Sequence, residues 1–167
     1  MPTFSTLSWL FAIGVTIHNA EEAWLLPDWS QTAGRWHHPV RAPVFRFAVS
    51  VLTLLAYALA AAVSIAGKAS VPAYLIAGYA LAMLLNVVIP HLLATLSLRR
   101  YAPGTLTALL LNLPITLVLL GRGFEEAYLQ WSTFSWSAPL VVGALIASLP
   151  VLFRIGARWF PNSPSGG

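Results

Sequence analysis

The sequence contains no cysteine. This absence excludes a disulfide framework, a thiolate metal site, an iron–sulfur cluster and a cysteine nucleophile. Charged residues are also scarce, at 8% of the chain against roughly 25% in soluble domains. Hydrophobic residues make up 58%, and the mean hydropathy is +0.76. A water-soluble fold of this size would not cover so much apolar surface, so the composition predicts an all-α polytopic membrane protein.

Acidic residues are the rarer charge, five against nine basic ones, which gives a net charge of +4. The basic residues do not form a patch. They lie at the ends of apolar segments, as topology determinants do. We therefore expect no nucleic-acid partner. No basic region precedes the first apolar segment, so that segment is not predicted to be a cleaved signal peptide.

Five apolar segments are long enough to span the hydrocarbon core of a bilayer. They predict a single domain, residues 1–160, built as a five-transmembrane-helix bundle and followed by a flexible tail, residues 161–167. The first helix is expected to end before Pro27, and the last to begin just after Ser137, with Pro139 in its first turn. The predicted helices cover residues 4–26, 44–66, 72–98, 105–121 and 138–160.

An odd number of spans puts the two termini on opposite sides of the membrane. With the N-terminus outside, seven basic residues lie inside and only Lys68 and Arg122 lie outside. The positive-inside rule favours this orientation. We therefore expect a multi-pass protein of a bacterial-type inner membrane, in contact with membrane lipid, with a cytoplasmic C-terminus.

The candidate site begins with His18, Glu21 and Glu22 in the first helix. Residues three and four apart share a helix face, and ionisable groups at membrane depth usually face the bundle interior. By helix rise, His18 lies about 12 Å before the predicted end of the first helix and His91 about 10 Å before the end of the third. Because these helices run in the same direction, contact between them would bring the two histidines together.

Two imidazoles and one or two carboxylates form a ligand set that suits zinc or iron and leaves positions open for water or substrate. In this interpretation His18 and His91 bind the metal with one of the two glutamates, and the other glutamate is a general base or a bridging ligand. A metal-free proton relay and a purely structural network are the alternatives that the spacing leaves open.

Other polar residues are weaker candidates. Asn86 lies beside the kink that Pro90 predicts and is expected in a second shell around the site, and Asn112 is expected to line a cavity. His37 and His38 are possible extra ligands from a tryptophan-rich loop. A second acidic pair, Glu125 and Glu126, follows Arg122 instead of a histidine and is interpreted as interfacial, on the opposite face from His18.

His18-x-x-Glu21-Glu22, a later isolated His91 and Tyr101-x-Pro103-Gly104 resemble the three signatures of the HXXEE family of small integral membrane proteins. The resemblance covers roughly residues 8–120. It implies a shared site through the histidines and glutamates and a role for the Tyr101 turn. Tyr101 is then a candidate proton donor, with an aromatic-belt position as the alternative. The family is one of unknown function, so the resemblance supplies no reaction.

The sequence favours a membrane-embedded metal-dependent enzyme that acts on a lipid-like or other apolar small molecule. Zinc would favour hydrolysis and iron would favour oxygen chemistry. A small proton- or metal-coupled transporter with the same residues is the alternative, although no inverted repeat is visible. A non-catalytic scaffold is the third hypothesis. Small-residue faces at Ala60 and Ser64, and at Gly143 and Ala147, suit helix packing in a homodimer.

Overall fold

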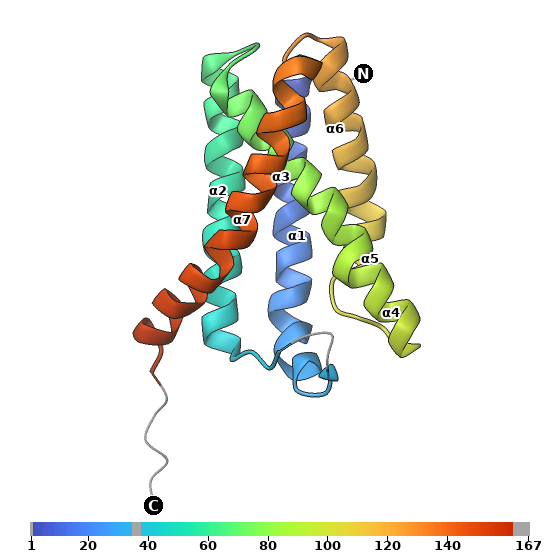
Figure 1. Ribbon diagram of the computed structural model, residues 1–167, viewed down its shortest axis with the longest axis vertical. Coiled ribbons are helices and arrows are strands. Elements are labelled where there is room, and N and C mark those ends of the chain that lie inside the picture. The colour runs from blue at the N-terminus through green and yellow to red at the C-terminus, as the bar shows by residue number, and fades with distance from the viewer. Residues whose placement is uncertain (1, 35–37, 162–167) are drawn as a thin grey trace, which may run out of the picture.

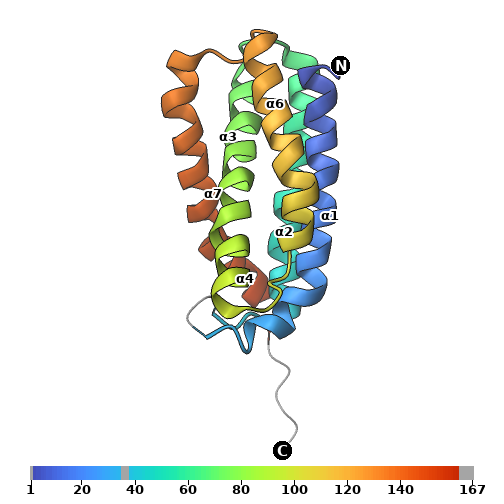
Figure 2. The ribbon, with the colours of Figure 1, turned by 90° about the vertical axis from the view of Figure 1, so that its right-hand side faces the viewer.

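The computed structural model describes residues 2–34 and 38–161. Every regular element within these residues is a helix, which confirms the predicted all-α class, and the helices run along one long axis (Figures 1 and 2). Of these, η3 is a π-helical segment, whereas η2 contains a break in the helical backbone at Ile89. In chain order the elements are α1 (Phe4–Ser30), α2 (Ala42–Ala66), α3 (Val71–Asn86), η2 (Val87–Leu92), α4 (Leu93–Leu98), α5 (Thr105–Thr107), η3 (Ala108–Asn112), α6 (Leu113–Glu125) and α7 (Trp131–Trp159).

Among the described residues, four helical stretches are long and apolar enough to cross a membrane: Ala42–Ala66, Val71–Leu98, Thr105–Glu125 and Trp131–Trp159. α1 is of similar length but is not one of them, because residues 18–22 lower its mean hydropathy. Large apolar side chains on the outer surface are exposed, among them Ile65 at 88% and Leu54 at 67%. Such surface is unfavourable in water and supports association with a membrane.

α1 does not end before Pro27 as predicted. It continues through this proline to Ser30. Proline has no N–H, so the carbonyl of Ala23 loses its helical partner. The Arg46 Nε of α2 donates to that carbonyl at 3.1 Å. The hydrogen bond supplied by α2 satisfies this carbonyl within a continuous helix.

The last helix also differs from its predicted bounds, because α7 begins at Trp131 and contains Pro139 in its interior. Trp131 stacks on Phe134, with ring centroids 5.5 Å apart, and both rings meet the edge of Phe124 at 4.7 and 5.3 Å. This aromatic cluster fixes the start of α7 against the end of α6. α6 itself runs on to Glu125 instead of ending at Gly121.

The helical stretch over residues 71–98 is interrupted at the predicted kink. α3 ends at Asn86, and Ile89, directly before Pro90, has φ −123° and ψ 115°. Proline disfavours helical backbone in the residue before it. This break lies within η2, and His91, which follows Pro90, is buried in the interior.

α1 packs mainly on α2 and α6, whereas α3 packs mainly on α7, α6 and α2. The start of α1 and the last turns of α7 lie at opposite ends of the bundle (Figure 1). The small-residue face of α2 is used within the chain, because the Ser64 hydroxyl bonds with Ser5 and accepts from the Trp9 indole. Gly143 and Ala147 of α7 remain exposed.

Candidate metal centre

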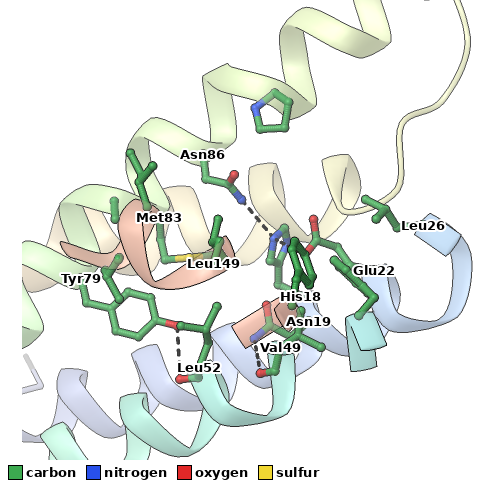
Figure 3. Close-up of a pocket in the computed structure, with 16 residues that line it drawn as sticks. His18, Asn19, Glu22, Leu26, Val49, Leu52, Tyr79, Met83, Asn86 and Leu149 are labelled. Atoms are coloured by element: carbon green, nitrogen blue, oxygen red, sulfur yellow. Dashed lines mark hydrogen bonds and ion pairs between the residues drawn. The ribbon is translucent and has the colours of Figure 1, made fainter. Parts of the chain in front are cut away.

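Three side chains within the described part of the chain bring one ligand atom each to within 4.8 Å of the others: His18, Glu22 and His91. The first two project from α1 and the third from η2. The histidines are 0% and 2% exposed, and the Glu22 side chain is 13% exposed. The two imidazoles meet edge to face, with centroids 5.0 Å apart. Figure 3 shows His18, Glu22 and Asn86 gathered at one side of a cavity.

The spacing within this cluster is wider than that of hydrogen bonds. Glu22 Oε1 lies 3.4 Å from His91 Nε2, and Glu22 Oε2 lies 3.8 Å from His18 Nε2. Hydrogen bonds from nitrogen to oxygen span about 2.7–3.2 Å. A tetrahedral metal with bonds of about 2.0–2.1 Å separates neighbouring ligand atoms by about 3.4 Å. The spacing therefore resembles that of a ligand set more closely than that of a hydrogen bond.

The ring orientation of His18 is fixed from behind by Thr107. The Thr107 hydroxyl is 2.6 Å from Glu21 Oε2 and 3.0 Å from His18 Nδ1. Because a threonine hydroxyl has one hydrogen and the carboxylate only accepts, the hydroxyl donates to Glu21 and accepts from Nδ1–H. His18 Nε2 is then left with a lone pair, directed at Glu22. A histidine ligand held this way by a chain that ends at a carboxylate is typical of metal sites.

His91 is oriented by the Asn86 side chain. His91 Nε2 is 2.9 Å from the Asn86 amide nitrogen, which also lies 3.4 Å from His18 Nε2. Asn86 thus donates toward both ring nitrogens from the edge of the cluster. It occupies the neighbouring position that the sequence predicted for it.

The two adjacent glutamates point to different partners. Glu21 accepts at Oε1 from the Tyr101 hydroxyl and, at 3.0 Å, from the Gly104 N–H. At Oε2 it accepts from the Thr107 hydroxyl and, at 3.3 Å, from the Thr107 N–H. A carboxylate offers about four acceptor positions, so Glu21 is saturated. The structure thus gives Glu21 a positioning role, whereas the sequence left either glutamate as a ligand.

Tyr101 lies behind Glu21 rather than beside the histidines. Its hydroxyl donates to Glu21 and accepts from the Leu106 N–H at 3.1 Å. Burial and then the hydrogen bond to Glu21 raise the pKa of Tyr101 above its usual value of 10.0. The hydroxyl therefore stays protonated at neutral pH and holds Glu21 in place. The predicted proton donation to a bound ligand has no direct geometric support.

Gly104 forms the floor of the cluster. A Cβ at this position would lie 2.6 Å from His91 Cε1, 2.9 Å from His18 Cε1 and 3.1 Å from Glu22 Cγ. Its φ of 88° is also in the left-handed region that favours glycine. Two independent constraints therefore require a glycine here. The turn at residues 101–104 closes directly against all three candidate ligands.

The histidines do not meet through extensive packing of α1 on α3. The segment formed by α5 and η3 contacts α1, α3 and η2, and lies between them. Because α1 continues to Ser30, His18 lies about 18 Å from the end of its helix instead of the expected 12 Å. The additional turn extends to the end of α4, where Arg100 donates to the Thr32 carbonyl at 2.8 Å and lies over the Trp29 ring.

A cavity of about 300 Å³, which we call the proximal chamber, opens from this cluster. His18, Asn19, Glu22 and Asn86 form its polar side (Figure 3). The remaining wall is apolar except for Tyr79. It consists of Leu26, Phe45, Val49, Leu52, Tyr79, Ala82, Met83, Pro90, Leu145, Ile146, Leu149 and Phe153.

The other candidates lie elsewhere. Asn112 is 1% exposed but does not line the proximal chamber, and its amide has no hydrogen-bond partner. It lies beside Gly14 of α1, and Gly14 is one helical turn before His18.

The loop histidines do not join the cluster within the described residues. His38 is exposed and is not part of the cluster, and His37 falls outside the described residues. Glu126 accepts from the Phe4 N–H at the start of α1, far from His18, and pairs with Arg122 as expected.

Sequence reasoning did not find Thr107. A single threonine in the first turn of a helix carries no pattern that separates it from the other threonines, and its role depends on the fold bringing it between His18 and Glu21. Gly104 was noticed only as a turn residue. Its contact with both imidazoles comes from the packing of the turn and could not be derived from spacing.

Comparisons with known proteins identify the family of this chain. The family model described as "Protein of unknown function with HXXEE motif" matches residues 9–119. The "Uncharacterized protein YrkK" of Bacillus subtilis (strain 168) is 36% identical over 151 residues, which is 90% of this chain and 96% of that protein. No solved structure matches. The chain therefore belongs to the HXXEE family, as its His18, Glu21 and Glu22 motif indicated.

Proposed function

We propose that this protein is a membrane-embedded metal-dependent enzyme that acts on a lipid-like or other apolar small molecule. One observation carries the proposal: two imidazole nitrogens and a carboxylate converge, buried, at the polar side of an otherwise apolar chamber. The Asn86 amide donates toward the two ring nitrogens, at 2.9 and 3.4 Å, but among the described residues no hydrogen-bond donor reaches Glu22. A metal ion or a shared proton would supply the electropositive partner of this largely buried carboxylate. The distances of 3.4 and 3.8 Å from Glu22 to the two imidazoles favour the metal, which would take the place of Asn86 at the ring nitrogens.

His18, His91 and Glu22 would hold the ion, and Glu21, Thr107 and Gly104 would hold the ligands. Bound zinc would supply a hydroxide near neutral pH, and bound iron would supply oxygen chemistry. Because Glu21 is saturated, Glu22 is the carboxylate that faces the chamber and is available to ligate the ion or accept a proton. The apolar wall would exclude water and orient the substrate.

We also propose that α1 is a fifth span, with the N-terminus outside and the C-terminus in the cytoplasm. Its 27 residues extend over about 40 Å, which is sufficient to cross the hydrocarbon core. His18, Glu21 and Glu22 face protein partners rather than the outer surface, as intramembrane charges do, and Asp28, near the end of the helix, is exposed. The positive-inside rule supports this orientation, which puts the metal centre nearer the cytoplasmic side.

Metal analysis of detergent-purified protein tests the proposal, with wild type beside His18→Ala and His91→Ala. We expect close to one zinc or iron per wild-type chain and a loss in both variants while helical content is retained. His38→Ala removes a histidine outside the cluster and is the matched control, so it should keep the metal. Absence of metal from wild type prepared without chelators would overturn the proposal.

The transporter alternative predicts a different result. A carrier with the same ligands would move zinc or iron ions into sealed liposomes, and His18→Ala would abolish that movement. We expect no ion uptake above that of empty liposomes, because the wall of the proximal chamber is apolar except on one side. Uptake that depends on His18 would replace the enzyme proposal with the transporter.

A further inference from the structure

α7 crosses the bundle and packs closely on neighbouring helices at two points. Near the first, a Cβ on Gly78 of α3 would lie 2.5 Å from the Val141 Cβ. Near the second, a Cβ on Gly156 of α7 would lie 3.1 Å from a Phe47 ring carbon of α2. The absence of side chains at both glycines lets the helices approach closely. Figure 1 shows α7 crossing α3 and reaching α2 at its far end.

A second cavity of about 240 Å³ lies under α7 and is called here the distal chamber. It shares two wall residues, Tyr79 and Leu145, with the proximal chamber. The two chambers are therefore adjacent along the same helix, between these two points of close packing. Phe153 of the proximal chamber and Val141 of the distal one are twelve residues apart, about 18 Å along α7. The other distal residues are Leu55, Leu59, Leu75, Ala144 and Ser148.

Polar groups without a backbone hydrogen-bond partner lie at only one end of the two adjacent chambers. In the distal chamber, the Tyr79 hydroxyl donates to the Leu52 carbonyl at 3.3 Å, and the Ser148 hydroxyl donates to the Leu145 carbonyl at 2.7 Å. Both hydroxyls thus have backbone partners. Other polar side chains, His18, Glu22 and Asn86, lie beside one another at the far end of the proximal chamber. The two chambers thus combine a polar site at one end with an apolar extension along α7.

We propose that the ligand is a single-chain amphiphile, such as a long-chain fatty acid, alcohol or ester. Its polar end lies at Glu22 and its chain runs under α7 past Tyr79 and Leu145 into the distal chamber. This inference deepens the proposed function and depends on it for the chemistry at the polar end. Two chambers that adjoin along about 18 Å of one helix suit one extended chain.

The membrane is the source of this ligand. Ile146 lines the proximal chamber and is 62% exposed, and Leu75 lines the distal chamber and is 37% exposed. Both side chains therefore belong to the chamber walls and to the apolar outer surface at once. A chain from the membrane would enter past such side chains without crossing water, so its methylenes would stay in apolar surroundings.

The test uses photoreactive straight-chain fatty acids on the full chain in lipid nanodiscs. A reactive group at the chain end should label peptides that contain Leu59, Leu75 or Ala144, and one next to the carboxyl should label α1 around Glu22. Labelling of outer surfaces alone, or the same peptides for both probes, would overturn the inference.

A variant gives a second readout. Ala144→Trp fills the distal chamber and should weaken binding of a long chain about tenfold or more, the loss expected when two methylenes are displaced. Binding of a short chain should stay unchanged. Ala147→Trp is the matched control, because Ala147 is exposed like Ala144 but does not line the distal chamber. Equal effects on short and long chains would contradict the proposal.

Failure of this inference can be told apart from failure of the proposed function. Binding and labelling are measured on protein stripped of metal as well as on protein as purified. Protein that binds chains in the predicted register but never holds metal would overturn the enzyme proposal alone. Protein that holds metal but labels only on its outer surface would overturn the chain path alone.

Discussion

Two pairs of adjacent glutamates follow a basic residue at the same spacing, but one pair forms ion pairs and the other belongs to the candidate metal centre. Glu125 and Glu126 lie three and four residues after Arg122, and Glu21 and Glu22 stand at the same distances from a histidine, His18. Arg122 contacts both of its glutamates, at 2.7 and 2.5 Å. The permanent positive charge of the Arg122 guanidinium thus already pairs with both carboxylates.

The histidine pair behaves differently because imidazole can be a neutral lone-pair donor. His18 directs Nε2 toward Glu22, and His91 directs a second nitrogen to the same place. The same three- and four-residue spacing thus gives a closed ion pair at one end of α1 and an open ligand set about 27 Å further along it. The difference teaches that the identity of the basic residue, rather than the acidic pair, distinguishes a structural contact from a candidate site.

The largest expected effect comes from Glu22→Gln. The change keeps the size of the side chain but removes the negative charge that faces both imidazoles, so bound metal should fall to background in metal analysis. Glu125→Gln makes the same chemical change at the other pair and should leave the metal content at the wild-type level. Equal metal in both variants would mean that the two pairs do not differ as described.

Gly104→Ala should have the next largest effect. The added methyl would meet both imidazoles, and the left-handed backbone costs about 1–2 kcal/mol for a residue with a Cβ. Metal content should fall strongly, and Tm should drop by about 2–8 °C. A fully loaded variant with an unchanged Tm would show that the turn does not close against the ligands.

Thr107→Val removes the hydroxyl between Glu21 and His18 and keeps the shape of the side chain. Changes behind a metal ligand typically weaken metal affinity 10–100-fold, and we expect a loss of about that size in competition with a chelator. Thr6→Val, at the exposed start of α1, is the control. An affinity equal to that of wild type would contradict the proposed orientation of His18.

The smallest effect is expected from Arg122→Gln. It breaks the ion pairs with Glu125, which is exposed, and with Glu126, which is partly buried, and ion pairs that solvent reaches contribute little to stability. Metal content should stay unchanged and Tm should fall by less than in Gly104→Ala. Loss of metal in this variant would mean that the two ends of α1 are coupled, and the comparison would then fail.

The helices and the core of the candidate site could be predicted because both depend on local patterns. Hydrophobic segments defined the bundle, and the spacing of His18, Glu21 and Glu22 put them on one helix face. Pro90 correctly predicted a break before His91. Each of these features follows from a few neighbouring residues and does not depend on the rest of the fold.

The features that the sequence did not predict depend on partners far along the chain. α1 passes through Pro27 with a hydrogen bond from Arg46 of α2 to the Ala23 carbonyl. Glu21 is held away from the ligand set, unlike Glu22, because it binds Thr107, which lies 86 residues after it in the chain. No local pattern carries this information, because an alternative donor or acceptor can come from any helix that packs nearby.

The central claim is that His18 and His91 hold one ion together. X-ray absorption at the metal edge, on wild type and on His91→Ala, tests it most directly. We predict a first shell of nitrogen and oxygen at about 2.0–2.1 Å, with outer-shell scattering from two imidazoles in wild type and from one imidazole, or no bound metal, in the variant. A spectrum without imidazole scattering, or one that is identical in wild type and variant, would contradict the claim.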